Sequence, residues 1–374
     1  MKKTGTDQYL PQIKAGFIEN MAKNYNLSKD ESEKLIVSFL KVIEDASSYL
    51  FSENHAIPYS MIGFEIGYLR HYYPIETITA ALNVYNGDIN KVVEITKYAN
   101  RKGITIKDIR FGKSHGNYFP DKQNNAIYKG IASIKYCSAQ IADELLEVSK
   151  KGYDNFVDLV FDIKKNTTLD SRQMKILILL NFFNDFGKNK RLQKIFDIVN
   201  QYIKRKEFKK KDLDQGNHPF SEYMVKKYSG KETPAKYTQI DMRGLIKEWA
   251  TSVNDESFSA VYHIKNQYDF LGYATYKNPS INKAYWYVED VTYDTYDRMW
   301  ISLYNIKDGI EREMLLDSKS KNLLTREPIL KGEVIAVRFA KEEFIKHKSP
   351  EGKFVLTGAT RWRLFDWFLI KEGK

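Results

Sequence analysis

The spacing of hydrophobic residues changes along this 374-residue chain, and the change limits the folds that it can adopt. In the first half, apolar residues recur every three or four positions, as in "LIVSFLKVIEDASSYL", which predicts amphipathic helices. In about the last ninety residues, short stretches such as "YWYVEDVTY", "RMWISLYNI" and "GEVIAVRF" are rich in β-branched and aromatic residues and partly alternate, which predicts strands. We therefore expect an α+β, multidomain protein with a helical N-terminal half and a C-terminal β-barrel.

Local signals place several helix ends. Ser28 and Glu31 have the spacing of a capping box, ahead of a helix that carries Leu35, Phe39 and Val42 on one stripe. A further helix is expected from about Pro58 to His71, and Pro74 suits the first turn of the next one. Asp88 and Gly103 are typical of the start and the end of another helix. Residues 138–187 are again predicted to be helical, with starts at Ser138 and Asp170, and "SRQMKILILLNFF" is apolar enough to be buried.

The C-terminal strand pattern has the layout of a small barrel. Five strands are expected, with a hairpin turn at Lys307-Asp308-Gly309 and a short helix between Asp317 and Leu324. A helix after the third strand is the arrangement of an OB fold, although other small barrels fit the pattern nearly as well.

Composition favours a folded protein with a polyanionic partner. Hydrophobic residues make up 43% of the chain, and the net charge is +11. A basic surplus is typical of nucleic-acid-binding proteins, but it also serves general solubility. One cysteine, Cys137, suits a reducing compartment, and the six scattered histidines do not predict zinc binding. The sequence shows neither a signal peptide nor a run of 18 apolar residues, so we expect a cytoplasmic protein without a membrane span.

A basic run precedes a segment of mixed charge. Six lysines and arginines lie within the eight positions from Lys204 to Lys211. The following "DLDQGNHPFSEYMVKKYSGKETPAKY" contains glycine, proline and both charges, which predicts a linker. The basic run is either a DNA-binding element or a solvated helix end.

No catalytic centre is apparent in the sequence. Metal-dependent polymerases and nucleases need strand-borne carboxylates close enough to share two Mg²⁺ ions. Asp212 and Asp214 lie in the charged segment, where a solvated loop explains them better, and turn chemistry explains Asp290, Asp294 and Asp297. The chain has no Walker loop, GxGxxG or GxSxG. We expect no catalytic residue, no metal site and no cofactor in this chain.

The stretch "LFSENHAIPYSMIGFEIGYLRHYYP" from Leu50 to Pro74 resembles the end of the fingers domain in bacterial replicative DNA polymerase III alpha subunits. That family has approximately F-N-K-S-H-A-x-x-Y, then a buried helix, then L-K-x-H-Y-P-x-E-F. The matching residues are Phe51, His55, Ala56, Tyr59, Leu69, Tyr73, Pro74 and Glu76, and Arg70 stands where the family has lysine.

Four further resemblances follow in family order. "GIASIKYCS" is similar to G-I-x-A-I-K-G-V-G, and "LDSRQMKILILLNFFNDFG" is similar to L-N-R-R-V-L-E-K-L-I-x-S-G-A-F-D-x-L-G. "QIDMRGL" resembles the sliding-clamp motif Q-x-D-M-F, and "FLGYATYKNP" resembles L-L-G-F-Y-x-S-x-H-P ahead of the OB domain. Five matches in order extend over about residues 12–340 and are much stronger together than singly.

The resemblance implies an organisation. Residues 1–105 would be the end of the fingers, 106–200 a tandem helix-hairpin-helix module, 201–284 the basic segment and a linker with the clamp-like motif, and 285–374 an OB-like barrel. Expected on the nucleotide or template side are Asn54, His55, Tyr59 and Arg70, with a structural hydrogen bond as the alternative role for His55. Expected DNA-binding residues are Lys135, Ser138, Lys204, Arg205, Lys206, Lys209, Lys210, Lys211, Tyr285, Tyr287, Tyr293, Arg298, Trp300 and Arg338. Expected clamp-binding residues are Gln239, Asp241 and Met242.

Several residues depart from the family pattern. Glu53 replaces the lysine of N-K-S-H and would repel a triphosphate. Tyr136 and Ser138 replace the glycines of G-V-G, which in such hairpins let backbone amides approach a phosphate. Asn181 replaces the glycine of S-G-A-F and tolerates a left-handed turn. Arg243 replaces the aromatic residue of the clamp motif, so we expect clamp binding to be weak.

The family's phosphoesterase-like domain and its palm, which would bind Mg²⁺, are not represented. We therefore expect a C-terminal part of a DNA polymerase III alpha-type protein, inactive alone, that binds single-stranded and primer-template DNA. The palm would lie on another chain or on a missing segment. The alternatives are a non-catalytic adaptor or decoy of the replication machinery and, less suited to the long helical half, a plain single-strand-binding protein.

Overall fold

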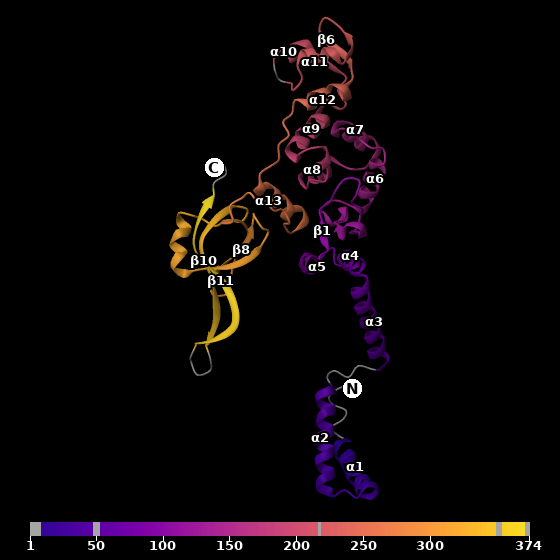
Figure 1. The fold of residues 1–374 in the computed structure, drawn as a ribbon, viewed down its shortest axis with the longest axis vertical. Coiled ribbons are helices and arrows are strands. Elements are labelled where there is room, and N and C mark those ends of the chain that lie inside the picture. Colours follow the sequence, from indigo (N-terminus) through magenta and orange to yellow (C-terminus); the bar gives the residue numbers. More distant parts are fainter. Residues whose placement is uncertain (1–8, 48–52, 216–217, 349–353, 371–374) are drawn as a thin grey trace. The chain divides into compact units, whose positions relative to one another are not determined.

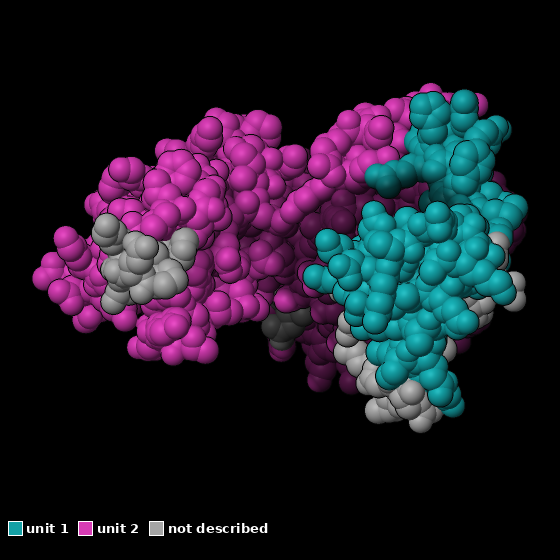
Figure 2. Space-filling view, turned by 90° about the horizontal axis from the view of Figure 1, so that it is seen from below, with its two compact units in different colours: residues 1–74 teal, residues 75–374 magenta. Residues whose placement is uncertain are grey.

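The computed structural model describes residues 9–47, 53–215, 218–348 and 354–370 (Figure 1). The chain divides into two compact units, Met1–Pro74 and Ile75–Lys374, which are coloured teal and magenta in Figure 2. No helix in these described ranges is both long and apolar enough to cross a bilayer.

Unit 1 consists of helices. They are α1 (Leu10–Tyr25), α2 (Lys29–Ser47) and α3 (Glu53–Tyr72). The predicted capping box of α2 is confirmed: the Ser28 amide donates to the Glu31 carboxylate at 3.1 Å, and the Glu31 amide donates to the Ser28 hydroxyl at 3.3 Å. Both exchanges satisfy amides that have no partner within the helix.

The predicted apolar stripe of α2 does not face the core of its unit. Leu35, Phe39 and Val42 are 51%, 59% and 63% exposed, whereas Ser32 and Ile36 are buried. Spacing identified the helix correctly, but it does not determine which face a neighbouring element covers.

Helix α3 begins earlier than predicted. It starts at Glu53, so that Pro58 lies inside it and not at its start. A proline there removes one backbone hydrogen bond of the helix, because its nitrogen carries no hydrogen.

The helical part of unit 2 begins with α4 (Pro74–Val84) and α5 (Ile89–Arg101). The predicted cap is confirmed, since the Asp88 side chain accepts from the Lys91 amide, and Gly103 follows the helix with a φ of 75°. The short strands β1 (Thr105–Lys107), β2 (Phe119–Asp121) and β3 (Ala126–Tyr128) form a sheet in the order β1-β3-β2, in which β1 and β3 are parallel.

Four helices form the centre of unit 2. They are α6 (Ala139–Ser149), α7 (Phe156–Asn166), α8 (Ser171–Leu179) and α9 (Asn189–Tyr202). Asp170 forms a complete capping box with Gln173 at the start of α8. The predicted burial of this helix is confirmed by Met174, Ile176, Leu177 and Ile178, which belong to the main hydrophobic core.

The expected linker is folded, and that prediction is wrong. Strands β4 (Glu207–Lys209), β5 (Ser229–Glu232) and β6 (Lys236–Ile240) form an antiparallel sheet in the order β4-β6-β5. The helices α10 (Lys210–Asp214), α11 (Glu222–Lys227) and α12 (Met242–Thr251) accompany it. Phe208, Phe220 and Tyr237 are each about 2% exposed or less and join the main core. These separated aromatic residues outweigh the turn-forming composition that suggested a linker.

Helix α13 (Ala260–Leu271) leads into the predicted barrel, whose strands are β7 (Tyr285–Tyr293), β8 (Met299–Asn305), β9 (Glu311–Leu316), β10 (Val334–Lys348) and β11 (Phe354–Ile370). They close in the order β10-β11-β9-β8-β7, with β9 and β11 parallel. The predicted turn between β8 and β9 is confirmed, with Gly309 at a φ of 74°, and so is the short helix η5 (Ser318–Thr325) after the third strand. The α+β class is therefore confirmed.

Two clusters stabilise the barrel. One fills its interior with residues such as Val288, Ile301 and Leu364. The other lies on the α13 side, where Ile264 packs with Tyr287 and Tyr304. The Tyr304 hydroxyl also donates to the Tyr276 carbonyl at 2.7 Å, so the barrel is attached to the preceding segment by both apolar and polar contacts.

Candidate nucleic-acid interface

The first expected hairpin lies between η3 (Ile131–Ser133) and α6. Tyr136 has a φ of 73° and is 55% exposed. The Arg172 guanidinium lies 3.6 Å from the centre of its ring, and Gln173 donates to its carbonyl at 2.8 Å. Lys135 and Ser138 are exposed beside it. The ring and the guanidinium thus cover the place at which a glycine hairpin would present bare backbone.

The neighbouring thiol and lysine do not form a reactive site. Burial, reinforced by Asp170, raises the pKa of the Cys137 thiol to about 11.

Lys135 and Lys331 line a cavity of about 340 Å³ together with Tyr268, Asp269, Gly272, Tyr287, Glu289 and Asp290. Burial raises the pKa of Glu289. The lining mixes both charges, so this cavity does not favour an anion.

The second expected turn follows α8. Asn181 adopts a φ of 62°, as predicted for a residue in place of glycine. Its amide nitrogen lies 3.5 Å from Nδ1 of His263, and the amide nitrogen of Asn189 lies 3.4 Å from Nε2 of the same ring. Burial lowers the pKa of His263, whose ring stacks on Tyr276. The histidine therefore joins α13 to the turn as a neutral structural residue.

The basic run forms one edge of the sheet β4-β6-β5. Lys210 pairs with Glu232 at 2.5 Å, and Arg205 lies over the Phe208 ring at 4.3 Å while it donates to the Glu207 carbonyl. The exposed lysines of the run are Lys204, Lys206, Lys209 and Lys211, and none of them forms an ion pair within the described residues. Four of the six basic residues are thus available to phosphates, and the other two stabilise the fold.

The expected barrel aromatics divide into exposed and buried residues. Tyr293 is 61% exposed, and Tyr285 and Trp300 are half-buried. Tyr287 is 4% exposed and stacks on Tyr268 at 5.7 Å, so its predicted contact with DNA is wrong in this structure. Strand alternation points it into the cluster that joins the barrel to α13.

The expected arginines of the barrel are partly engaged. Arg298 pairs with Asp294 at 2.7 Å, and Trp300 donates to the same carboxylate. Asp294 also accepts from the Tyr296 amide, which confirms that turn chemistry explains this aspartate. Arg338 lies 3.8 Å from Asp366 and over the Phe368 ring, with its side chain 59% exposed.

The residues expected on the nucleotide side belong to α3. Asn54 and His55 lie in its first turn, but their side chains are outside the described residues. Tyr59 is 69% exposed, and Arg70 lies in the last turn. Large apolar side chains are exposed all along the helix, including Met61 at 60% and Phe64 at 74%.

The clamp-like motif is built into the fold and does not lie on a flexible peptide as predicted. Gln239 is the last but one residue of β6 and has a φ of 56°. Asp241 caps α12 by accepting from the Gly244 amide, and Met242 is 5% exposed. Met242 is therefore unavailable as an anchor in this structure.

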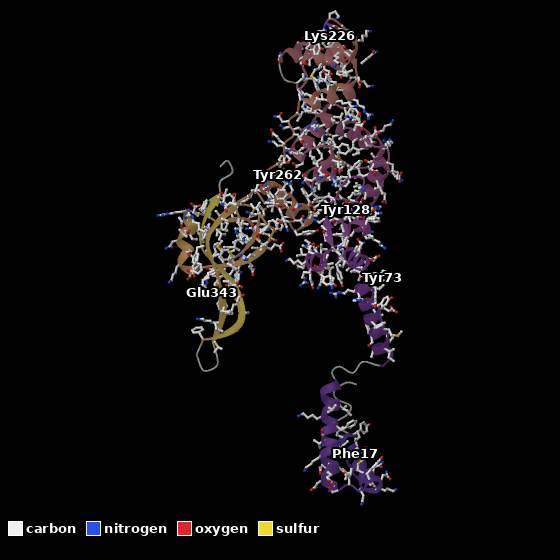
Figure 3. The ribbon with its side chains drawn as sticks, in the orientation of Figure 1. Phe17, Tyr73, Tyr128, Lys226, Tyr262 and Glu343 are labelled. Atoms are coloured by element: carbon white, nitrogen blue, oxygen red, sulfur yellow. The ribbon has the colours of Figure 1, made fainter. Side chains whose placement is uncertain are left out.

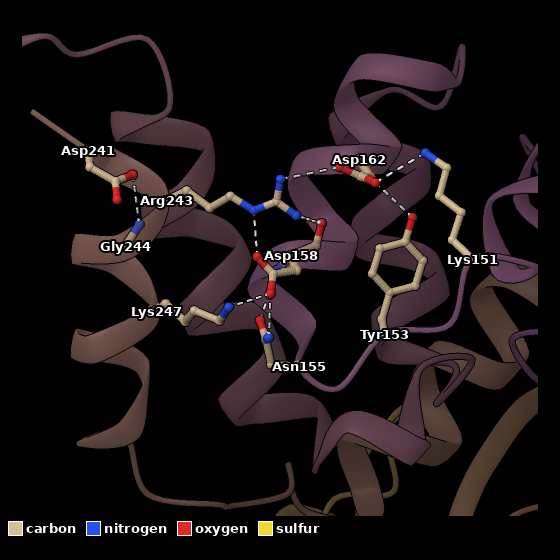
Figure 4. Close-up of polar contacts among 9 residues, drawn as sticks. All are labelled: Lys151, Tyr153, Asn155, Asp158, Asp162, Asp241, Arg243, Gly244 and Lys247. Atoms are coloured by element: carbon tan, nitrogen blue, oxygen red, sulfur yellow. Dashed lines mark hydrogen bonds and ion pairs between the residues drawn. The ribbon is translucent and has the colours of Figure 1, made fainter.

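Arg243, the departure from the clamp motif, has a structural role of its own (Figure 4). Its Nε donates to Asp158 at 2.5 Å, its Nη2 donates to the Asp158 carbonyl at 3.2 Å, and its Nη1 lies 3.5 Å from Asp162. Lys247 pairs with Asp158 at 2.6 Å. Burial opposes ionisation of Asp158, but Lys247, Asn155 and Arg243 outweigh it and lower its pKa to about 2.

Sequence reasoning missed one aromatic-cation cluster on the barrel. The Arg312 guanidinium lies 3.7 Å from the centre of the Trp362 ring and 5.5 Å from that of Trp286. Trp362 lies opposite Met314 in the parallel pairing of β11 and β9, which no local pattern in the sequence reveals. The signal that could have pointed to it is the stretch Arg361-Trp362-Arg363, which places an aromatic residue between two cations.

Metal ligation finds no support within the described side chains, which contain no group of three or more His, Cys, Asp or Glu placed to hold an ion. Asp212 lies half-buried in α10, and the Asp214 side chain is outside the described residues.

Comparison with known proteins finds similarity to one kind of polymerase subunit. DNA polymerase III subunit alpha of Ureaplasma parvum is 25% identical over 189 residues, which cover 49% of this chain and 18% of that protein. The Bacillus subtilis subunit is 25% identical over 187 residues (49% and 16%), and the Staphylococcus aureus subunit is 29% identical over 178 residues (46% and 16%). Over about half of its length, this chain is similar to the alpha subunits of DNA polymerase III. No family model matches it.

The resemblance drawn from the motifs is thereby confirmed at the level of the family. The similar region spans less than a fifth of the length of these relatives. Against the family pattern, the left-handed residues Tyr136 and Asn181 stand where the motifs have glycine. Both turns therefore place a residue with a side chain in the left-handed region that favours glycine.

Proposed function

We propose that this chain is a DNA-binding, C-terminal portion of a DNA polymerase III alpha-type protein, which positions template and primer for a palm on another polypeptide or segment. The observation that carries the proposal is the closed barrel of unit 2. Around the barrel the hydrogen-bonded strands follow the order β7-β8-β9-β11-β10, and β10 closes on β7. Strands β9 and β11 are parallel, and η5 lies between β9 and β10 in the chain. This five-stranded arrangement fits an OB fold, which binds oligonucleotides on its strand face and loops.

The charge and exposure of the described residues support a DNA-binding role. Lys204, Lys206, Lys209 and Lys211 are exposed along one edge of a sheet, where they suit the sequence-independent neutralisation of phosphates. Exposed Tyr293 on β7 lies opposite Met299 on β8, and half-buried Trp300 on β8 lies opposite Thr292 on β7. Such aromatic residues suit stacking on unpaired bases.

Helix α3 supports a protein partner. Tyr59, Phe64 and Tyr72 are 69%, 74% and 62% exposed, although they stand on different sides of the helix. A helix that is apolar on all sides is ordinarily buried, and contiguous exposed apolar surface of this kind marks an interface. The palm-bearing part of a polymerase is the partner that the proposed function requires.

The adaptor function stays a second candidate because the same helix favours it. A non-catalytic component that docks on the replication machinery also needs an apolar docking helix. The sliding clamp is a less suitable partner, because Met242 is buried and Asp241 is engaged in capping α12.

The test is DNA binding by the purified chain, measured by fluorescence anisotropy with labelled single strands and primer-template duplex over a range of salt concentrations. We expect binding of both and a decrease in affinity that is linear in the logarithm of salt concentration. Primer extension with Mg²⁺ is measured in parallel and is expected to be absent. Lack of binding to both DNA forms at low salt rules out the positioning function and leaves the adaptor.

A further inference from the structure

The hairpin of β10 and β11 extends well beyond the barrel. β10 pairs with β7 from Val334 to Ala336, and β11 pairs with β9 from Trp362 to Leu364. The two strands pair with each other as far as Lys348 and Phe354. Figure 1 shows this two-stranded ribbon in yellow, below the barrel. We call residues 338–348 with 354–361 the ribbon. Within the described residues, no covering element follows from the pairing of the ribbon, which lies beyond the residues that β7 and β9 pair with.

The base of the ribbon is held by ion pairs. Arg363 bonds Asp317 at 2.9 Å and Glu343 at 2.6 Å, and Arg361 bonds Glu343 at 2.9 Å. Figure 3 labels Glu343 at this position. These two arginines are therefore engaged in orienting the ribbon and do not supply free positive charge.

The outer part of the ribbon has one face of aromatic, aliphatic and basic residues. Phe344 and Lys346 are two positions apart on β10 and share a face, since side chains alternate along a strand and the register shift between these two residues places its extra residues on β11. The register places Lys346 opposite Leu356 and Lys348 opposite Phe354, so Leu356 and Phe354 lie on that same face. Phe344, Leu356 and Phe354 are 56%, 55% and 73% exposed. We call these residues the outer face.

The net charge of the ribbon indicates which kind of ligand it can bind. Six basic and three acidic residues lie between Arg338 and Arg361, and the whole chain carries +11. On the outer face Lys346 is exposed and forms no ion pair with any described residue, whereas Lys341 lies on the opposite face of β10. Glu342 shares the outer face, and its carboxylate accepts from the Thr360 hydroxyl at 2.6 Å. Exposed rings beside the unpaired Lys346 match an unpaired nucleic-acid strand, whose bases stack on rings while its phosphates attract cations. A purely apolar partner would leave the ammonium group of Lys346 without compensation.

We propose that the outer face of the ribbon is a single-strand DNA site, in which Phe344 and Phe354 stack on unpaired bases and Lys346 contacts the backbone. This inference rests on the proposed DNA-binding function and adds a location to it. Because a stacked duplex offers no free base faces along its length, the site distinguishes unpaired from paired DNA.

The test compares the chain carrying both Phe344→Ser and Phe354→Ser with a matched control. The control is Val355→Ser, which is 45% exposed and lies next to Phe354 but on the opposite face of the ribbon. Affinities for a labelled 20-nucleotide oligo-dT and for a 20-base-pair duplex are measured by anisotropy. We expect the double variant to bind oligo-dT about tenfold more weakly, the duplex unchanged, and the control to bind both as the unsubstituted chain does.

The outcomes separate this site from the proposed function. If the unsubstituted chain binds oligo-dT and the double variant binds it equally well, the ribbon is not the site, although DNA binding stands. If the unsubstituted chain binds neither probe, both proposals fail. If the double variant keeps its DNA affinity but light scattering shows that a self-association of the unsubstituted chain is lost, the outer face is a protein contact and the inference is overturned. A second double variant, Phe344→Trp with Phe354→Trp, should retain or strengthen the binding of oligo-dT.

Discussion

Arg243 joins α12 to α7 through Asp158: its Nε donates to the carboxylate at 2.5 Å, and its Nη2 donates to the backbone carbonyl of the same residue at 3.2 Å. Two contacts from one guanidinium to one residue fix both the separation and the rotation of the two helices. The residue that departs from the clamp motif is therefore explained by the fold of this chain.

Replacing Arg243 should lower stability. Arg243→Met removes the charge but keeps the length of the side chain, and it leaves Lys247 as the cation beside Asp158. Because the Arg243 side chain is 42% exposed, we expect a loss of about 1 kcal/mol in the free energy of unfolding. A double-mutant cycle with Asp158→Asn in urea measures the coupling. Independent effects of the two substitutions would show that the contact contributes nothing.

Acid should weaken the same contact. The pKa of Asp158 is lowered to about 2 in the folded chain, below the usual value of 3.8, so the unfolded chain binds the proton more readily. The stabilisation is present above about pH 4 and is lost as the pH falls toward 2. Urea unfolding at several pH values should show a shallower acid loss for Arg243→Met than for the unsubstituted chain. Parallel curves for the two proteins would contradict the assignment.

The basic edge should control the salt dependence of DNA binding. We expect Lys206→Ala, Lys209→Ala and Lys211→Ala together to flatten the log-log salt slope on duplex by up to about three contacts of 0.9 each. The matched control is Lys210→Ala, because Lys210 is engaged with Glu232 and should leave the slope nearly unchanged. An unchanged slope in the triple variant would mean that these lysines are solvated and make no contact with DNA phosphates.

Tyr136 should tolerate glycine better than alanine. Its φ of 73° strains any residue with a Cβ, and the cost is about 1 kcal/mol. Tyr136→Ala keeps this strain and loses the contact with Arg172, whereas Tyr136→Gly loses the same contact but relieves the strain. Thermal melting should therefore rank the glycine variant above the alanine variant. Only the glycine variant should also gain duplex affinity, since its amides become open to a phosphate.

The sequence predicted elements whose causes are local. The capping box at Ser28, the helix start at Asp170 and the left-handed Asn181 were predicted because each depends on residues within a few positions of one another. The strands and turn of the barrel were predicted for the same reason. The role of Met242 was not, because "QIDMR" fits a clamp peptide and a helix start equally well, and only Asp241 as cap distinguishes them.

What covers each apolar surface could not be predicted. Leu35 and Phe39 have helical spacing but are exposed, and Phe208 and Tyr237 look isolated in a charged segment but are buried. Both outcomes depend on contacts between segments far apart in the chain. The contact between Arg312 and Trp362 has the same origin, since it depends on the pairing of β9 with β11.

The neutral form of His263 should make stability sensitive to mild acid. Burial lowers the pKa of the ring below its usual value of 6.5, so the unfolded chain takes up a proton that the folded chain resists. Stability is full above about pH 6.5 and declines as the pH falls below it. His263→Gln, which retains hydrogen-bonding capacity toward Asn181 and Asn189, should flatten this decline between pH 7 and 5. The measurement is the urea midpoint at each pH, and an identical decline in both proteins would assign it to other groups.

Substitutions at two tyrosines of β7 should separate an effect on folding from an effect on DNA binding. Tyr287 lies near the start of the strand, and Tyr293 is its last residue. Tyr287 is 4% exposed and packs with Tyr268 and Val334, so Tyr287→Ala should lower stability by about 3 kcal/mol or more through the cavity that it leaves. Tyr293 is 61% exposed, so Tyr293→Ala should leave the melting temperature within about a degree or two. Its binding of oligo-dT should weaken severalfold if the ring stacks on a base. Tyr293→Phe is the matched control and should keep that affinity, because it retains the ring and loses only the hydroxyl. Equal binding by the alanine and phenylalanine variants would place the DNA contact of the barrel away from this end of β7.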